Sequence, residues 1–189
     1  MPSEVASEMI LVILVVVIGV AVAGFSFGFL APQVAFSNAQ NQASNIASSS
    51  SLSVGPLLIN SSNAGSLVVM LYNPAFNGTA CILAFTAPSY LQPSAGVYTP
   101  SNIQPFSVYW PNGSKAQTVQ ISSPIYETSG NILYQPSGQV TLYKVTFNTP
   151  VTVVMNNVNS NDIVIIWFII NEGGYWFRIG YTYTGVPST

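Results

Sequence analysis

The chain has very little charge and no histidine. Its 189 residues include three Lys and Arg and five Asp and Glu. The charged residues are Glu4, Glu8, Lys115, Glu127, Lys144, Asp162, Glu172 and Arg178. An ordinary soluble protein carries about a quarter charged residues, so Ser, Thr, Asn, Gln and Tyr have to solvate this surface. The shortage of Lys and Arg argues against nucleic acid as a partner, because proteins bind nucleic acid by neutralising its phosphates.

The absence of histidine excludes several kinds of active site. It excludes nucleophiles activated by histidine, as in Ser-His-Asp and Cys-His sites, and it excludes most zinc sites. It also excludes all blue-copper ligand sets, so the chain cannot be a membrane-anchored cupredoxin. Glu127, Asp162 and Glu172 each lie beside a turn or strand end, where solvated turn residues are expected in place of a glycosidase pair. Arg178 is expected to stack or pair structurally. We therefore expect no catalytic residue, no cofactor and no metal.

Cysteine is represented by Cys81 alone, so an intrachain disulfide is impossible. Cys81 lies in the apolar run of residues 80–85. A thiol in such a run is expected to be buried and inert.

A long apolar run, residues 9–31, contains no charge and one hydroxyl, Ser26. As a helix these residues would span about 34 Å, enough to cross the hydrocarbon core of a bilayer. Every face is apolar, so an amphipathic surface helix is excluded, and lipid or protein has to enclose the run.

Three interpretations of this run compete. A cleaved signal peptide would use the small-x-small site at residues 21–23. The preceding MPSEVASE lacks the positive start of a signal, and the apolar run continues beyond that site. A single-span anchor and a helix that forms the core of a filament are the other two.

Pro32 follows the apolar run and is expected either to kink the helix or to end it. Apolar residues then follow a three-and-four spacing that continues a narrow helical stripe to about Ser48: Phe36, Ala39, Ala43, Ile46 and Ala47. Residues 48–51 are expected to form a hinge. The alternative is a flexible Ser/Asn linker.

The rest of the chain is typical of strands. Short runs rich in Val, Ile, Tyr, Phe and Thr alternate with Asn- and Gly-containing turns and predict strands at residues 53–59, 66–72, 81–86, 106–110, 118–122, 140–147, 151–155, 163–170 and 175–184. Residues 163–170 are apolar without alternation, which suits a central strand. In the last run Trp176, Arg178 and Thr182 alternate with Tyr175, Phe177, Ile179, Tyr181 and Tyr183. Seven to nine such strands predict an antiparallel β-sandwich.

Three acceptor sequons for N-linked glycans begin at Asn60, Asn77 and Asn112. All follow the apolar run and lie in turn-like segments, so the domain is expected to face outside, with its glycans supplying the missing solvation. Life in a strongly acidic medium, where carboxylates are protonated, is the alternative explanation for the missing charge.

An apolar N-terminal helix joined to a charge-poor, sequon-bearing β domain resembles the archaeal type IV pilins, especially those of thermoacidophiles. The residues that carry the resemblance are the run 9–31, the stripe to Ile46 and the strands after Ser53. It implies a helical homopolymer with the helices in its core and glycosylated immunoglobulin-like domains outside. The family's basic leader is absent, so the chain is already processed or is cut at an unusual site such as Ala6. The glycine-threonine start of archaellins is also absent, which favours a pilus.

These observations predict an α+β protein: a hydrophobic helix and hinge at 1–52 and an immunoglobulin-like antiparallel sandwich at 53–189. Small residues that let helix backbones approach closely are Gly19, Ala21, Ala23, Gly24 and Gly28. The predicted function is that of the major subunit of an extracellular adhesive pilus, assembled from a membrane-inserted pool. Its partners are identical subunits, the membrane before assembly and N-linked glycans. The alternative is a single-span, glycosylated surface module for adhesion or binding.

Overall fold

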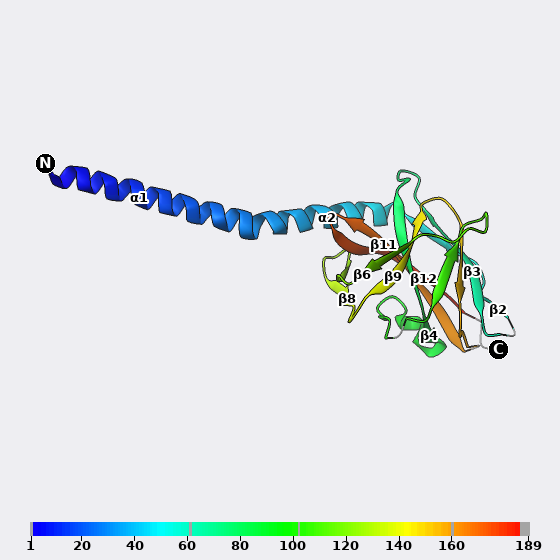
Figure 1. Cartoon of the computed structure of the whole chain (residues 1–189). Helices are drawn as coiled ribbons and strands as arrows, with labels where there is room; N and C mark the ends of the chain where they lie inside the picture. Colours follow the sequence, from blue (N-terminus) through cyan, green and yellow to red (C-terminus); the bar gives the residue numbers. More distant parts are fainter. Residues whose placement is uncertain (1, 61, 102, 160, 186–189) are drawn as a thin grey trace. The chain divides into compact units, whose positions relative to one another are not determined.

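The computed structural model describes residues 2–60, 62–101, 103–159 and 161–185. It confirms the predicted class, because a long N-terminal helical segment precedes a β-sandwich of two sheets (Figure 1). The chain forms two compact units, Met1–Asn38 and Ala39–Thr189. The sandwich unit therefore starts before residue 53, where the sequence places the domain boundary, and includes the end of the helical segment.

The helical segment contains α1 (Pro2–Phe25), the π-helical turn η1 (Ser26–Leu30) and α2 (Ala31–Ser48). The π turn has a local cause in Pro32. Proline has no N–H to donate to the carbonyl four residues earlier, that of Gly28. The N–H of Ala31 donates to the carbonyl of Ser26, five residues back. A single π turn accommodates this defect, so the helix continues to Ser48 as its apolar stripe predicts.

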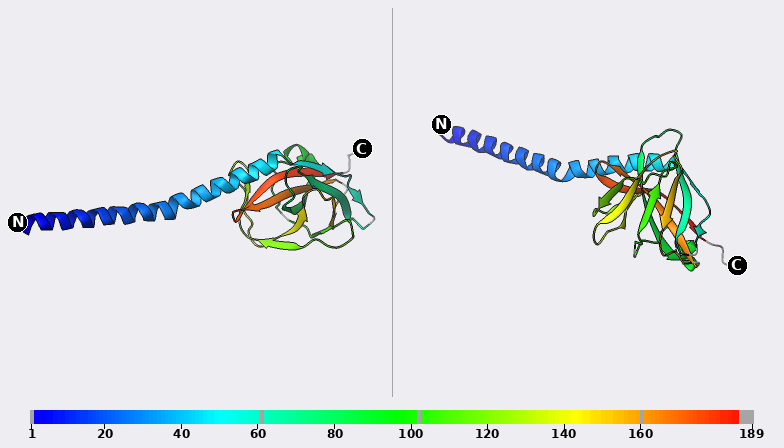
Figure 2. Two further views of the ribbon diagram at one scale, coloured as in Figure 1. Left: turned by 90° about the horizontal axis from the view of Figure 1, so that it is seen from above. Right: turned by 45° about the vertical axis from the view of Figure 1, so that its right-hand side comes forward.

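Two hydrogen-bonded sheets form the sandwich (Figure 2). The five-stranded sheet has the order β1-β3-β10-β5, with β2 also paired to β3, and the seven-stranded sheet has the order β6-β9-β4-β11-β12-β7-β8. The first sheet comprises β1 (Ser51–Val54), β2 (Leu58–Ile59), β3 (Gly65–Tyr72), β5 (Phe106–Tyr109) and β10 (Val151–Met155). The second comprises β4 (Thr79–Pro88), β6 (Thr118–Ile121), β7 (Ile125–Glu127), β8 (Ile132–Tyr134), β9 (Val140–Thr146), β11 (Asp162–Glu172) and β12 (Tyr175–Gly185). A short 3-10 helix, η2 (Ser89–Ser94), follows β4.

Each predicted strand run coincides with a strand, and the first is divided into β1 and β2. The sequence missed β7 and β8, because three residues are too few to display an alternating pattern. The pairing is antiparallel except between β7 and β12, which run parallel. The wholly antiparallel sandwich expected from the sequence is corrected at that one pair.

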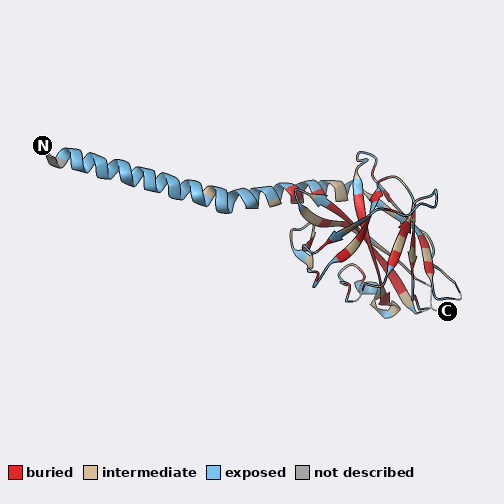
Figure 3. Ribbon diagram, in the orientation of Figure 1, coloured by how far each residue is buried: buried red, intermediate tan, exposed pale blue. Residues whose placement is uncertain are grey.

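Both faces of the seven-stranded sheet are buried along β11. All residues from 163 to 170 are buried, as their unbroken apolar run predicts (Figure 3). On the face toward the other sheet, the Tyr143 hydroxyl donates to the Phe106 carbonyl at 2.8 Å. The two rings meet at a centroid distance of 5.0 Å. This contact joins β9 of one sheet to β5 of the other.

The opposite face of this sheet has a second apolar layer. Trp167 of β11 packs edge-on against Phe85 of β4 at 5.2 Å. Tyr98, from the segment after η2, lies 6.3 Å from Phe85, and Tyr134 of β8 lies 6.3 Å from Trp167. The segment between β4 and β5 and the β7–β8 hairpin thus cover a face that would otherwise be open to solvent.

The end of α2 packs within the sandwich unit. Ala39 and Ala43 are 3% and 0% exposed. The Gln40 side-chain amide donates to the Thr128 carbonyl at 3.1 Å. A β-carbon added at Gly173 would lie 3.3 Å from the Ala39 methyl group. Small residues on the helix stripe therefore allow the helix to approach the strand turns closely.

The expected hinge at residues 48–51 is a hydrogen-bonded helix end. The fully buried Asn73 side chain donates to the Ile46 carbonyl at 3.2 Å and to the hydroxyls of Ser49 and Ser50 at 2.9 and 3.0 Å. Asn148 binds the main chain of Asn73 on both sides, accepting from its N–H at 2.8 Å and donating to its carbonyl at 3.0 Å. Two asparagines thus fix the end of the helix to the turns after β3 and β9.

Replacing Asn73 by alanine should lower the free energy of unfolding of the sandwich by about 2–3 kcal/mol, because a buried network loses its donor and leaves partners unsatisfied. Guanidinium unfolding of the full-length chain in detergent, followed by tryptophan fluorescence, measures this. All three tryptophans lie in the sandwich unit. Asn156→Ala, at an exposed position, is the control and should unfold like the parent. An unchanged midpoint for Asn73→Ala would contradict the role of the network.

Candidate functional sites on the helix and the sandwich

The first candidate site is the surface of α1. Its large apolar side chains from Met9 to Val22 are 54–68% exposed (Figure 3). By length and composition the helix is long and apolar enough to cross a membrane. Complete burial of one such side chain contributes about 1.5–3 kcal/mol, so leaving them all in water costs on the order of 20 kcal/mol. This surface therefore needs a cover.

The predicted contact positions on α1 and η1 are open. A β-carbon added at Gly19, Gly24 or Gly28 would meet no atom within 4 Å, and Ala23 is exposed. Because these residues have small side chains or none, the backbone of a second helix could approach closely at these positions. That they contact another helix stays a prediction.

Two of the three predicted glycosylation sites share one local geometry. The Asn112 Oδ1 accepts hydrogen bonds from the N–H and hydroxyl of Ser114 at 2.9 and 2.7 Å. The Asn60 Oδ1 accepts the same pair from Ser62 at 3.0 and 3.1 Å. The middle residue of that sequon, Ser61, lies outside the described residues. Both asparagines are exposed, and within the described residues neither Nδ2 has a hydrogen-bond partner.

The third predicted site, Asn77, has a different environment. It is exposed, and its Oδ1 accepts a hydrogen bond from Asn148 Nδ2 at 2.7 Å. It is thereby linked to the asparagine network at the end of α2. Its own Nδ2 still has no partner among the described residues.

The carboxylates of the sandwich lie apart. Asp162 and Glu172 stand at opposite ends of β11, about 33 Å from each other at the usual rise of a strand. Asp162 accepts hydrogen bonds from the backbone and side chain of Asn159. Glu127 pairs with Arg178. Across the described part of the chain, no three His, Cys, Asp or Glu residues gather as metal ligands.

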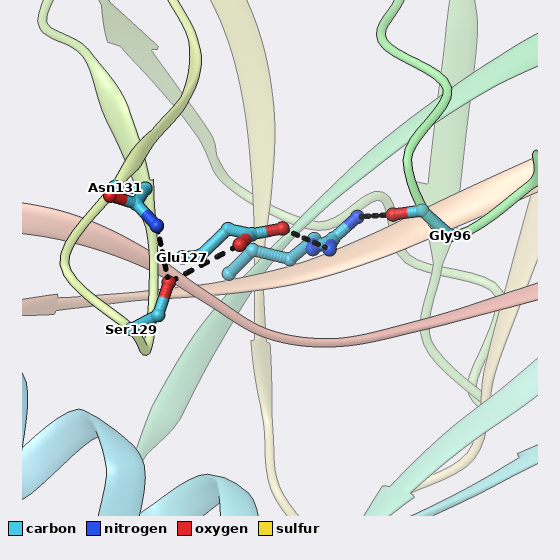
Figure 4. Close-up of polar contacts among 5 residues, drawn as sticks. Gly96, Glu127, Ser129 and Asn131 are labelled. Atoms are coloured by element: carbon cyan, nitrogen blue, oxygen red, sulfur yellow. Dashed lines mark hydrogen bonds and ion pairs between the residues drawn. The ribbon is translucent and has the colours of Figure 1, made fainter.

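A second polar cluster contains Arg178 together with Gly96, Glu127, Ser129 and Asn131, the four residues labelled in Figure 4. The Arg178 side chain is 10% exposed, and its Nη2 lies 3.1 Å from the Glu127 carboxylate. Its Nη1 donates to the Gly96 carbonyl at 2.6 Å. Glu127 also accepts from Ser129 at 3.3 Å, and the Ser129 hydroxyl accepts from Asn131 at 3.3 Å. One guanidinium thus ties both covering segments to β12.

The same guanidinium stacks on aromatic rings, as the sequence predicts. Its Cζ lies 5.1 Å from the ring centroids of both Trp167 and Tyr181. Burial lowers the pKa of Arg178 below its ordinary value, while Glu127 and Tyr181 act in the opposite direction. Trp167 Nε1 is buried and has no hydrogen-bond partner among the described residues. The cluster is structural, with its positive charge balanced inside it.

A β-bulge interrupts the last strand. Phe168 pairs with Gly180 and Ile169 pairs with Arg178, so Ile179 is one residue more than the partner strand provides. Glycine inside a strand is typical of such a bulge.

The bulge changes which face of the sheet the tyrosines occupy. Beyond it, Tyr181 pairs with Trp167, so it lies on the face that carries Trp167 and Arg178. Tyr183 lies two residues further on the same face. The sequence placed both tyrosines on the face of Phe177, which was wrong because a simple alternation assumes no extra residue.

A cavity of about 330 Å³ lies between β5 and β9. It is lined by Ile103, Gln104, Pro105, Phe106, Gln139, Val140, Thr141 and Tyr143. The lining has no charged or strongly nucleophilic side chain. It could hold a small neutral molecule, and the Tyr143 hydroxyl in its lining is already hydrogen-bonded to the Phe106 carbonyl.

Cys81 is buried, as predicted. Burial raises the pKa of its thiol from 9.0 to about 11, against the opposing effect of Lys144. The thiolate is the reactive form, so this cysteine is poorly suited to nucleophilic or redox chemistry.

Comparison with known proteins assigns no family. No protein-family model and no curated protein matches the chain. The chain is similar to the solution structure of a lipoprotein from Bacteroides thetaiotaomicron, with 11% identity, a TM-score of 0.36, and coverage of 74% of this chain and 80% of that one. It is also similar to a conjugate transposon protein from Bacteroides vulgatus, with 9% identity, a TM-score of 0.31, and coverage of 74% and 85%. Similarity at this level carries no argument about function.

Cys81 should react slowly with a disulfide reagent such as DTNB at pH 8. A pKa of about 11 in place of 9.0 lowers the thiolate fraction about 100-fold. The rate in the folded full-length chain should therefore be at least that much lower than in 6 M guanidinium, and equal rates would contradict the burial. Because the folded pKa is the higher one, this group stabilises the fold fully below pH 9, and its contribution is lost as pH rises towards 11.

Intact-mass spectrometry tests the glycosylation sites. Asn60, Asn77 and Asn112 should carry glycans, since all three are exposed and their Nδ2 atoms have no hydrogen-bond partner among the described residues. Asn60→Gln and Asn112→Gln should each remove one glycan mass, whereas Asn131→Gln, outside any sequon, should remove none. A parent mass equal to that of the bare polypeptide would contradict this prediction and leave acid adaptation to explain the missing charge.

Proposed function

We propose that this chain is a non-catalytic surface protein whose apolar helix inserts in a membrane and whose β-sandwich faces outside. The observation that carries the proposal is α1, a helix of membrane length that is apolar and exposed on every side. The absence of a charged side chain between residues 9 and 31 allows this helix to lie in lipid without cost. The exposed sequons support an outward-facing sandwich.

We further propose that the helix leaves the lipid to pack with identical helices in an extracellular adhesive filament, as in an archaeal type IV pilus. Lipid and neighbouring helices are similarly apolar, so the exchange has little hydrophobic cost, and small residues permit close packing.

A single-span anchor for a lone binding module is the second candidate. Like the filament subunit, this module would have a membrane-length helix and an outward-facing sandwich. The difference is that its helix would stay in the membrane instead of packing with identical helices. The two functions separate when cells that express the chain are sheared. A filament subunit is released in fibres that contain the full-length chain, helix included, whereas an anchored module stays in the membrane fraction.

Overpacking the helix should separate assembly from insertion. Gly24→Leu and Gly28→Leu should abolish fibres while the membrane-inserted pool remains, because added volume is felt only where helices meet. Val22→Leu, a similar change at a position that is already large, is the matched control and should assemble normally. Fibre yield by electron microscopy and membrane content by immunoblot measure the two pools. Normal fibres from both glycine variants would refute close helix packing at these positions.

A further inference from the structure

We propose that exposed tyrosines at the end of β12 and on η2 form a binding platform for a neutral polysaccharide. This tyrosine platform consists of Tyr90, Tyr181 and Tyr183. Their residues are 77%, 41% and 37% exposed. The platform belongs to the sandwich unit, so the inference holds whether or not the helix assembles into a filament.

Two of the three platform rings, those of Tyr181 and Tyr183, are held in place before a ligand binds. Tyr181 stacks on Arg178 and lies against Gly96, where an added β-carbon would meet the tyrosine hydroxyl at 2.5 Å. Tyr183 accepts a hydrogen bond from Gln92 Nε2 at 3.5 Å. This bond joins η2 to β12, the segments whose positions are shown in Figures 1 and 2. Rings that are already ordered lose little conformational freedom on binding.

The charge around the platform favours a neutral ligand. The face of an aromatic ring attracts cations, but Arg178 already occupies one side of Tyr181 and repels a second positive charge. An anion gains little, because Arg178 is buried and paired with Glu127 at 3.1 Å. Ring faces, phenol hydroxyls and the Gln92 amide remain. This combination suits a sugar, which presents C–H groups to the ring face and hydroxyls to the polar atoms.

The size of the platform favours a sugar over a folded protein. At about 200 Å² per tyrosine, the exposed parts of three residues amount to about 300 Å². A stable protein–protein interface buries about 800 Å² on each partner. A few sugar rings are covered adequately by the smaller area, and repetition along a filament would raise the avidity of each weak contact.

The test uses the full-length chain as a detergent-solubilised monomer, so its outcome does not depend on filament assembly. The chain is mixed with particles of cellulose, chitin, amylose or mannan, and with alginate and albumin beads as acidic and protein probes. The parent should be retained on at least one neutral polysaccharide. A Tyr181→Ala/Tyr183→Ala variant should be retained at least tenfold less.

The controls separate loss of the platform from loss of the fold. Tyr181→Phe/Tyr183→Phe preserves the rings and should bind within about threefold of the parent. Tyr72→Ala removes a tyrosine that is 45% exposed on the other sheet and should bind like the parent. Tryptophan fluorescence and unfolding midpoints verify the fold of each variant. No retention on any neutral polysaccharide, equal retention of the alanine variant, or retention on alginate or albumin alone would overturn the proposal.

Discussion

An apolar helix without a polar face has to be enclosed by lipid or protein, because its exposure to water is unfavourable. The rest of this molecule depends on that constraint. Large apolar side chains from Met9 to Val22 are each more than half exposed in the single chain. Their burial is worth on the order of 20 kcal/mol, more than the typical net stability of a domain. Under the proposed function, membrane insertion would satisfy this requirement first. Packing against identical helices would satisfy it again without a large change in hydrophobic free energy.

Within the sandwich unit, polar contacts hold the end of α2 and the covering segments in place in an otherwise charge-poor protein. Asn73 and Asn148 close the end of α2, and Arg178 joins the two covering segments to β12. Each of these groups is hydrogen-bonded or paired inside the fold. Apart from a few charges such as the exposed Lys115 and Lys144, the described surface of the sandwich is solvated by hydroxyls, amides and tyrosine rings, groups that suit contact with neutral, hydroxylated surfaces.

The sequence predicted the elements better than it predicted their contacts. The unbroken apolar run at residues 163–170 and the stripe through Ala39 and Ala43 depend on local periodicity, so the central strand and the long helix were foreseen. The Asn73 network joins residues that lie far apart in the chain. Its contacts could not be predicted from the sequence, because no local sequence pattern indicates them. The alternation in the last strand failed at Ile179, although the glycine that follows is a signal that could have suggested a bulge.

For the candidate sites, too, the features that depend on local sequence could be predicted, whereas those that depend on three-dimensional contacts could not. Sequons and small helix residues are visible in the sequence, and the structure finds them exposed or open. The tyrosine platform was not visible, because it depends on the bulge and on the close approach of Gly96 to Tyr181. Similarly, the sequence predicted that Arg178 stacks or pairs, while its role in holding two covering segments needed the three-dimensional arrangement.

The central claim is that α1 is covered in every functional state. A cysteine introduced by Val16→Cys tests it most directly, because this side chain is 58% exposed in the single chain and the native Cys81 is buried. The account predicts that a membrane-impermeant maleimide labels this cysteine neither on whole cells nor in sheared surface material, and labels it fully after denaturation in detergent. Rapid labelling on intact cells or in the sheared material would show that the helix lies in water and would contradict the account.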